Sequence, residues 1–172
     1  MLKALAISNY RSIRALVLPL GSLNLVTGAN GSGKSNLYKA LRLLSDTALG
    51  SAAGSIAGEG SLASVLWAGP EQFSRGMIKG DQPVQGGPRK NRVNLRLGIA
   101  GDDSSYAIDF GLPAPVGRTL FDGDPEIKRE VIWIGETYHP SRLMIDRMGP
   151  VVKARDDSGA WQVLNRHLPV FD

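Results

Sequence analysis

A glycine-rich run, GANGSGKSN at residues 28–36, constrains the fold more strongly than any other stretch of this chain. Glycine loses the most conformational freedom on folding, so the three glycines at 28, 31 and 33 are costly in an ordered loop. The run follows an apolar segment, residues 23–27, which we expect to be a strand buried on both faces. After it, residues 35–44 carry apolar side chains with the i, i+3, i+4, i+7 spacing of an amphipathic helix. The fold must therefore require backbone without side chains at these glycine positions, between a strand and a helix.

The spacing of this run matches the phosphate-binding P-loop, in which a second glycine, five positions after the first, is followed by lysine and serine. Backbone N–H groups that curl around a polyphosphate act as fixed dipoles, and the helix that follows directs its positive N-terminus at the same phosphates. Lys34 can reach the β- and γ-phosphates, and the Ser35 hydroxyl can bind Mg²⁺. The residues predicted to bind nucleotide in this loop are Asn30, Gly31, Ser32, Gly33, Lys34, Ser35 and Asn36, and Ser35 is also the predicted metal ligand.

The run from residue 7 to residue 44 resembles the N-terminal segment of the RecF/SMC-like ABC ATPases, and the tight match covers residues 2–45. In that family an aromatic residue, a basic residue and a serine close the first strand, as at residues 10–12 here. Asn30 and Asn36 favour this group over transporter ATPases. The resemblance implies that Arg11 and Ser12 reach the nucleotide, and that the cofactors are ATP and Mg²⁺.

The resemblance also implies a fold and an activity. The fold would be the N-terminal lobe of an α/β P-loop NTPase, with a mixed β-sheet around the P-loop helix and an antiparallel β-subdomain. The complete protein would hydrolyse ATP as a homodimer joined head to tail, and would act in DNA repair or on DNA. The DNA assignment rests on the family and on a net charge of +4, which suits contact with nucleic acid.

Two motifs that such an ATPase needs have no good match in this chain, namely the Walker B strand and the LSGG-type signature. Asp109, Asp146 and Asp172 each end an apolar stretch, but none is followed by the glutamate that positions the attacking water. We interpret them as ordinary strand residues, so the catalytic residues are unknown. The chain then reads as a first lobe only, either a truncated fragment or half of a split protein. Its expected partner is a complementary ATPase lobe or a C-terminal remainder, without which it should hydrolyse ATP poorly or not at all.

The sequence predicts one lobe in three parts, residues 1–47, 48–91 and 92–172. In the first part we expect strands at 2–7, 15–18 and 23–27. In the second part, residues 50–60 are rich in small residues and read as a mobile loop, and Ser61 should cap a short helix over 61–67. The third part should be antiparallel strands at 93–99, 105–110, 130–134, 142–145, 151–154 and 161–164.

Composition excludes several classes of site. Without cysteine there is no disulfide framework and no thiolate metal site, and the two histidines, at 139 and 167, are too far apart for a metal-ligand pair. No apolar run approaches the ~20 residues of a membrane span, and the N-terminus does not resemble a signal peptide. We therefore expect a cytoplasmic protein without a membrane partner.

Two alternative functions use the same loop. A small-molecule or nucleotide kinase would carry an arginine-rich lid and an acceptor site soon after the first helix, but residues 50–60 contain no arginine and only one acid, Glu59. A non-catalytic scaffold would keep the loop for structure alone, and replacing Lys34 would then leave its function intact.

Overall fold

The computed structural model describes residues 1–87, 91–113 and 123–164. The strands are β1 (Leu2–Tyr10), β2 (Ile13–Pro19), β3 (Leu95–Gly101), β4 (Ser104–Gly111), β5 (Glu126–Ile134), β6 (Leu143–Met148), β7 (Val151–Arg155) and β8 (Trp161–Leu164). The helices are α1 (Lys34–Ala48), α2 (Ala52–Gly58), α3 (Leu62–Val65) and α4 (Arg75–Lys79), with a 3₁₀ turn at Pro140–Arg142.

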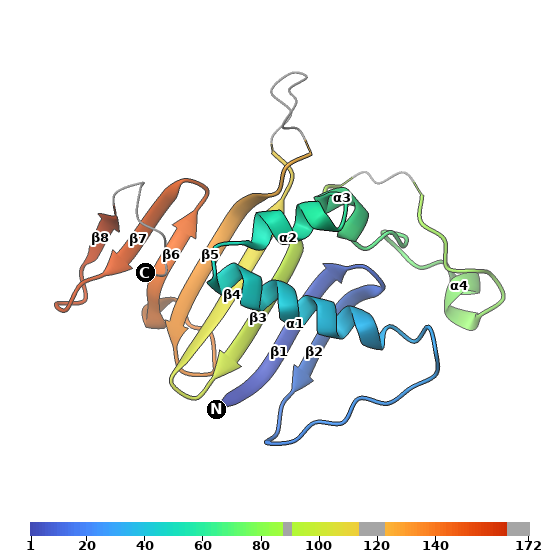
Figure 1. Cartoon of the computed structure of the whole chain (residues 1–172), viewed down its shortest axis with the longest axis horizontal. Coiled ribbons are helices and arrows are strands. Elements are labelled where there is room, and N and C mark those ends of the chain that lie inside the picture. Colours follow the sequence, from blue (N-terminus) through green and yellow to red (C-terminus); the bar gives the residue numbers. More distant parts are fainter. Residues whose placement is uncertain (88–90, 114–122, 165–172) are drawn as a thin grey trace.

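All eight strands form one sheet in the order β2-β1-β3-β4-β5-β6-β7-β8. Because β1 pairs with β3, the sheet joins the N-terminal hairpin to the strands that follow residue 92. Figure 1 shows α1 and α2 on one face of this sheet, while β6–β8 extend beyond the helices. The α/β class is confirmed. Every strand pair in the described part of the chain is antiparallel, however, whereas the sequence predicted a mixed sheet.

The core lies between α1 and the sheet. On α1 the side chains of Leu37, Ala40 and Leu44 are buried, as the helical spacing predicted, whereas Leu41, the fourth residue of the predicted stripe, is 38% exposed. On the strands, alternate residues such as Leu5 and Leu97 face the helix, because side chains of a strand point to opposite faces in turn. The predicted helix is therefore confirmed, and it continues one turn further, to Ala48.

The expected strand at residues 23–27 is wrong. This segment runs as a wide loop outside the sheet, between β2 and α1 (Figure 1). Leu23 is 91% exposed and Leu25 is 86% exposed. A strand buried on both faces needs neighbouring strands and a covering layer, and nothing in the described ranges supplies either for these residues.

The expected mobile loop at residues 50–60 is also wrong, because α2 occupies most of it. Ala52 and Ile56 lie one helical turn apart, and both are buried in the same core as α1. Burial of this pair outweighs the low helix propensity of the glycines around it. The short helix after it is confirmed, since the Ser61 and Ser64 side chains form a reciprocal capping box at the start of α3.

The strands predicted after residue 92 are confirmed as β3–β8, within a few residues at each end. The loop-like stretch before them contains α4, which lies apart from the sheet in Figure 1. The predicted hairpin of β7 and β8 is built around Asp156. Its carboxylate accepts hydrogen bonds from the backbone N–H groups of Ser158 and Ala160, both at 2.9 Å, and from the side chains of Ser158 and Gln162.

Acid should weaken this hairpin. The Ser158 side chain and the Ala160 backbone hold the pKa of Asp156 below its ordinary value of 3.8. A carboxylate with a lowered folded pKa stabilises the fold above its unfolded pKa, and that stability is lost as the pH falls through the folded value. We expect Asp156→Ala to lower the melting temperature at neutral pH, and the difference from wild type to shrink below about pH 4. Melting curves from pH 7 to pH 2.5 measure this. Asp157→Ala, an exposed neighbour, serves as the control.

Candidate functional site

The glycine loop, residues 28–35, ends at the first turn of α1. Gly33 is the residue before the helix and has a φ of 94°, and Gly31 has a φ of 81°. Both angles lie in the left-handed region that residues with a Cβ rarely adopt. Gly33 has no side-chain capping bond among the described residues. The positive N-terminus of α1 is therefore open toward the loop.

A side chain at position 33 would also meet the side chain of Ser12. A Cβ atom there would lie 2.9 Å from the Oγ of Ser12. Ser12 belongs to the turn between β1 and β2, and its Oγ accepts a 2.8 Å hydrogen bond from Asn36 Nδ2. The structure thus brings Ser12 beside the predicted loop residues, where the sequence placed it.

Lys34 folds back on the loop. Its Nζ donates to the backbone carbonyl oxygens of Gly28 at 2.6 Å and of Ala29 at 2.8 Å. An ammonium group held by two loop carbonyls is a suitable partner for phosphate oxygens, which are stronger acceptors than carbonyls. Ser35 follows it in the first turn of α1, with its side chain exposed. The residues of the loop therefore fit a bound polyphosphate, with Ser35 free to take a metal.

Arg11 is engaged elsewhere. Its Nε donates to Glu59 Oε2 at 3.0 Å, and its Nη2 forms a further close bond with the same oxygen. The guanidinium also lies 5.8 Å from the centre of the Tyr10 ring. The bond with Glu59 raises the pKa of Arg11 above its ordinary value. Arg11 thus precedes Ser12, which borders the loop, but its guanidinium is bonded to Glu59 just after α2, and its contact with nucleotide stays a prediction.

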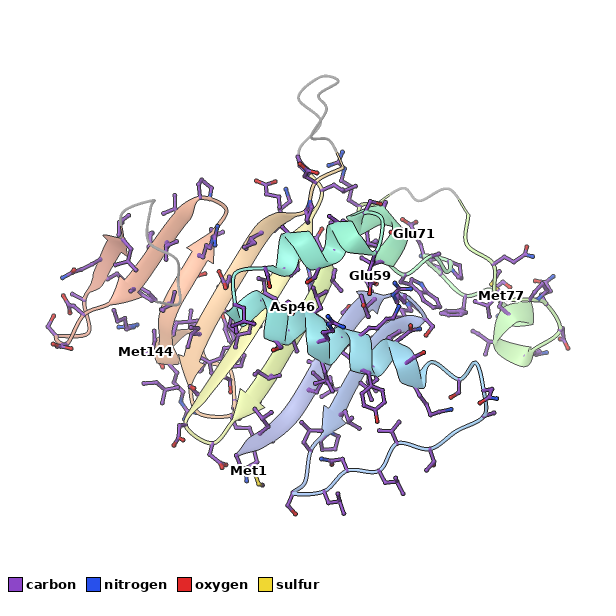
Figure 2. The ribbon with its side chains drawn as sticks, viewed as in Figure 1. Met1, Asp46, Glu59, Glu71, Met77 and Met144 are labelled. Carbon is purple, nitrogen blue, oxygen red and sulfur yellow. The ribbon has the colours of Figure 1, made fainter. Side chains whose placement is uncertain are left out.

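Glu59 is the residue of this region that sequence reasoning missed. It follows the last residue of α2 and lies between α1 and α3 in Figure 2. A cavity of about 400 Å³ borders it, lined also by Tyr10, Lys39, Arg42 and Asp46. No motif in the sequence marks this glutamate, because its partners come from β1 and α1 through the tertiary fold.

The two described Walker B candidates, Asp109 and Asp146, lie on the other face of the sheet. Asp109 is next in sequence to Ile108 and Phe110, which are buried in the core with α1, so its side chain points away from that helix. Its carboxylate pairs with Arg96 at 3.0 Å, and Asp146 pairs with Arg129 at 3.1 Å. These pairs support their interpretation as ordinary strand residues. Asp172 lies outside the described residues.

This open face of the sheet is hollowed into a groove of about 680 Å³. Its lining includes the small residues Ala6, Gly98 and Ala107 and the aromatic residues Trp133 and Tyr138. Within residues 1–87, 91–113 and 123–164, no group of three or more His, Asp or Glu side chains is placed to hold a metal ion. In the same ranges, no helix combines the length and the apolar character that crossing a membrane requires.

Comparison with known proteins adds two findings. The family described as "AAA domain, putative AbiEii toxin, Type IV TA system" matches residues 23–143, which is more than half of the chain. The chain is also similar to the DNA replication and repair protein RecF of Brucella abortus (strain 2308), at 33% identity over 160 residues, and to that of Brucella suis biovar 1 (strain 1330), at 32%. Each alignment covers 83% of this chain and 40% of the relative, so the chain spans well under half the length of these proteins.

Proposed function

The chain belongs to the AAA domain family whose model matches residues 23–143, and it is similar to RecF proteins over most of its length. From this premise we propose that its glycine loop binds ATP with Mg²⁺. One observation carries the proposal. Gly33 combines a φ of 94° with a position where a Cβ would clash with Ser12, directly at the open N-terminus of α1. A helix N-terminus reached by such backbone suits an anion, and Lys34, bonded to the loop carbonyl of Gly28, would add a cation beside it.

Each residue of the site has a role in this proposal. The N–H groups of residues 31–35 bind the phosphates, Lys34 exchanges its carbonyl partners for β- and γ-phosphate oxygens, and Ser35 binds the metal. Asn36 keeps the turn at Ser12 against the loop through its 2.8 Å hydrogen bond. Bound ATP would supply the phosphoryl group that the complete ATPase transfers to water.

Turnover needs an acid that this part of the chain does not place at the loop. Asp109 and Asp146 face away from α1 and are paired with arginines. We therefore assign the missing acid to a complementary lobe. Leu23, Leu25 and Tyr38 (67% exposed) are large apolar side chains left open to solvent on segments on either side of the loop in sequence, which suits a covering lobe.

The complete protein would work as a homodimer, and DNA is the proposed target. The support for DNA is the similarity to proteins named for DNA replication and repair, together with a net charge of +4.

Calorimetric titration tests the proposal with three ligands, namely Mg–ATP, Mg–ADP and AMP. The proposal assigns the β- and γ-phosphates to the loop and Lys34. The affinity should therefore fall by about tenfold from ATP to ADP, because a tenfold change corresponds to about one charge-assisted hydrogen bond. AMP, which has neither phosphate, should not bind measurably. A phosphate-release assay on the same sample should show no turnover above background. Equal affinity for ATP and AMP would refute recognition by the loop, and rapid phosphate release would refute the assignment of the acid to another lobe.

A further inference from the structure

One carboxylate, that of Glu59, gathers three potential partners. Its Oε2 accepts from Arg11 Nε at 3.0 Å and from the Tyr10 hydroxyl at 3.4 Å, and its Oε1 lies 3.8 Å from Lys39 Nζ. The side chains of Arg11 and Glu59 are only 28% and 26% exposed. The ion pair is therefore partly shielded from water, where an arginine–carboxylate contact is stronger than at an open surface.

The backbone of Arg11 is held as firmly as its side chain. Its N–H donates to the carbonyl of Val65 at 2.7 Å, and its φ of 49° lies in the left-handed region. A residue with a Cβ adopts this conformation at a cost of about 1–2 kcal/mol, and such strain is concentrated at functional turns. The next residue, Ser12, contacts Asn36 and borders Gly33. The turn thus connects α2 and α3 on one side with the glycine loop on the other.

Both cations assigned to the phosphates are bonded to oxygen atoms of the chain itself. Lys34 binds two carbonyls of the loop, and Arg11 binds Glu59. The two cases differ, because a carbonyl is a neutral acceptor while a carboxylate carries a full charge and competes more strongly with phosphate. An arginine that must first leave a carboxylate contributes less to binding than a free one, since the cost of breaking that pair is subtracted from the affinity.

We infer that Glu59 is an internal competitor of the nucleotide for Arg11: it holds the guanidinium in the nucleotide-free chain and limits the affinity for ATP. This inference rests on the proposed function, since it requires the glycine loop to bind a polyphosphate next to Arg11. It assigns to α2 a role in setting that affinity. Glu59 acts through Arg11 and is not placed in contact with nucleotide.

Neutralising the competitor should strengthen binding. The variant Glu59→Gln keeps the size of the side chain and removes its charge, so Arg11 becomes available to phosphate. We expect the Kd for Mg–ATP to fall by about 3- to 10-fold, the range of one partly exposed ion pair. In an Arg11→Ala background the same substitution should change the Kd by less than about twofold. Glu136→Gln, an exposed glutamate at the end of β5, removes the same charge and should leave the Kd unchanged.

Three outcomes would overturn the inference. An unchanged or weaker affinity in Glu59→Gln would mean that Glu59 does not compete or that it orients Arg11 for binding. A gain that persists in the Arg11→Ala background would mean that the effect passes through Lys39 or through net charge. A third measurement needs no variant: the NMR signal of Arg11 Nε–H in the wild-type chain should shift on addition of Mg–ATP, and a signal that does not move contradicts the exchange of partners. Failure of the wild-type chain to bind Mg–ATP at all would instead refute the proposed function.

Discussion

Replacing Lys34 by alanine is expected to weaken Mg–ATP binding by about 10- to 100-fold. The reason is that Lys34 is the cation inside the loop, with its Nζ held 2.6 Å and 2.8 Å from two backbone carbonyls. Charge-assisted hydrogen bonds to phosphate are worth about 1.5–3 kcal/mol, which corresponds to this range of affinity. Calorimetry on the variant and on wild type measures the difference.

The fold should survive this change, because Lys34 lies in the first helical turn and its partners are carbonyls of an exposed loop. Lys153→Ala, an exposed lysine on β7, removes the same charge far along the sheet and should keep the wild-type Kd. A Lys34→Ala chain that melts like wild type and binds ATP equally well would show that the loop is structural. The scaffold alternative would then hold.

A large loss of stability is expected from Glu130→Ala. Glu130 lies on β5, is 3% exposed, and accepts a 2.8 Å hydrogen bond from the Tyr106 hydroxyl. Its other oxygen lies 3.4 Å from Arg147 Nη1. Removing the carboxylate leaves a partly buried guanidinium without its counter-charge and a buried hydroxyl without this acceptor. Such a break costs about 3 kcal/mol.

Urea denaturation measures this free energy of unfolding. Glu130→Gln should cost less, because the amide oxygen can still accept from Tyr106. Glu136→Ala, at an exposed position, should change the free energy by no more than about 0.5 kcal/mol. If Glu130→Ala lowers the free energy of unfolding by less than about 1 kcal/mol, the buried Glu130 carboxylate does not stabilise the contact between β4, β5 and β6. The loss should also be larger than that of any exposed charge in the sheet.

Local signals in the sequence were enough for α1, the glycine loop and the strands β3–β8. The helix has its apolar stripe, the loop has its glycines, and the β7–β8 hairpin has the turn residues at Asp156, so each signal lies within a few residues of the structure it forms. The pairing of β1 with β3 joins strands about 90 residues apart, and no local pattern specifies it.

The errors at residues 23–27 and 50–60 have opposite causes. The first segment has the composition of a buried strand, but it lacks neighbours in the described part of the chain, so it stays exposed. The second has the composition of a loop, but Ala52 and Ile56 gain burial against α1 and become helical. In both cases tertiary packing decides the state, and composition alone could not show whether the packing partners were present.

At the candidate site, the sequence predicted the glycine positions of the backbone but did not predict the ion pairs between side chains. The positions that require glycine follow from the loop pattern, and the structure agrees at Gly31 and Gly33. The contact between Arg11 and Glu59 depends on where α2 ends relative to the β1–β2 turn. That geometry arises only when the sheet and the helices are assembled, so the sequence could name Arg11 but could not find its partner.

The most direct test of the central claim, that the glycine loop is the ATP site, is to map the bound nucleotide by NMR. Backbone amide signals of the 172-residue chain would be followed during titration with Mg–ATP. If the glycine loop binds ATP, the largest shifts fall on residues 28–36, with a further shift at the Arg11–Ser12 turn, and Lys34→Ala removes them. Shifts centred instead on the groove of the open sheet face, or on the cavity beside Asp46, would contradict it.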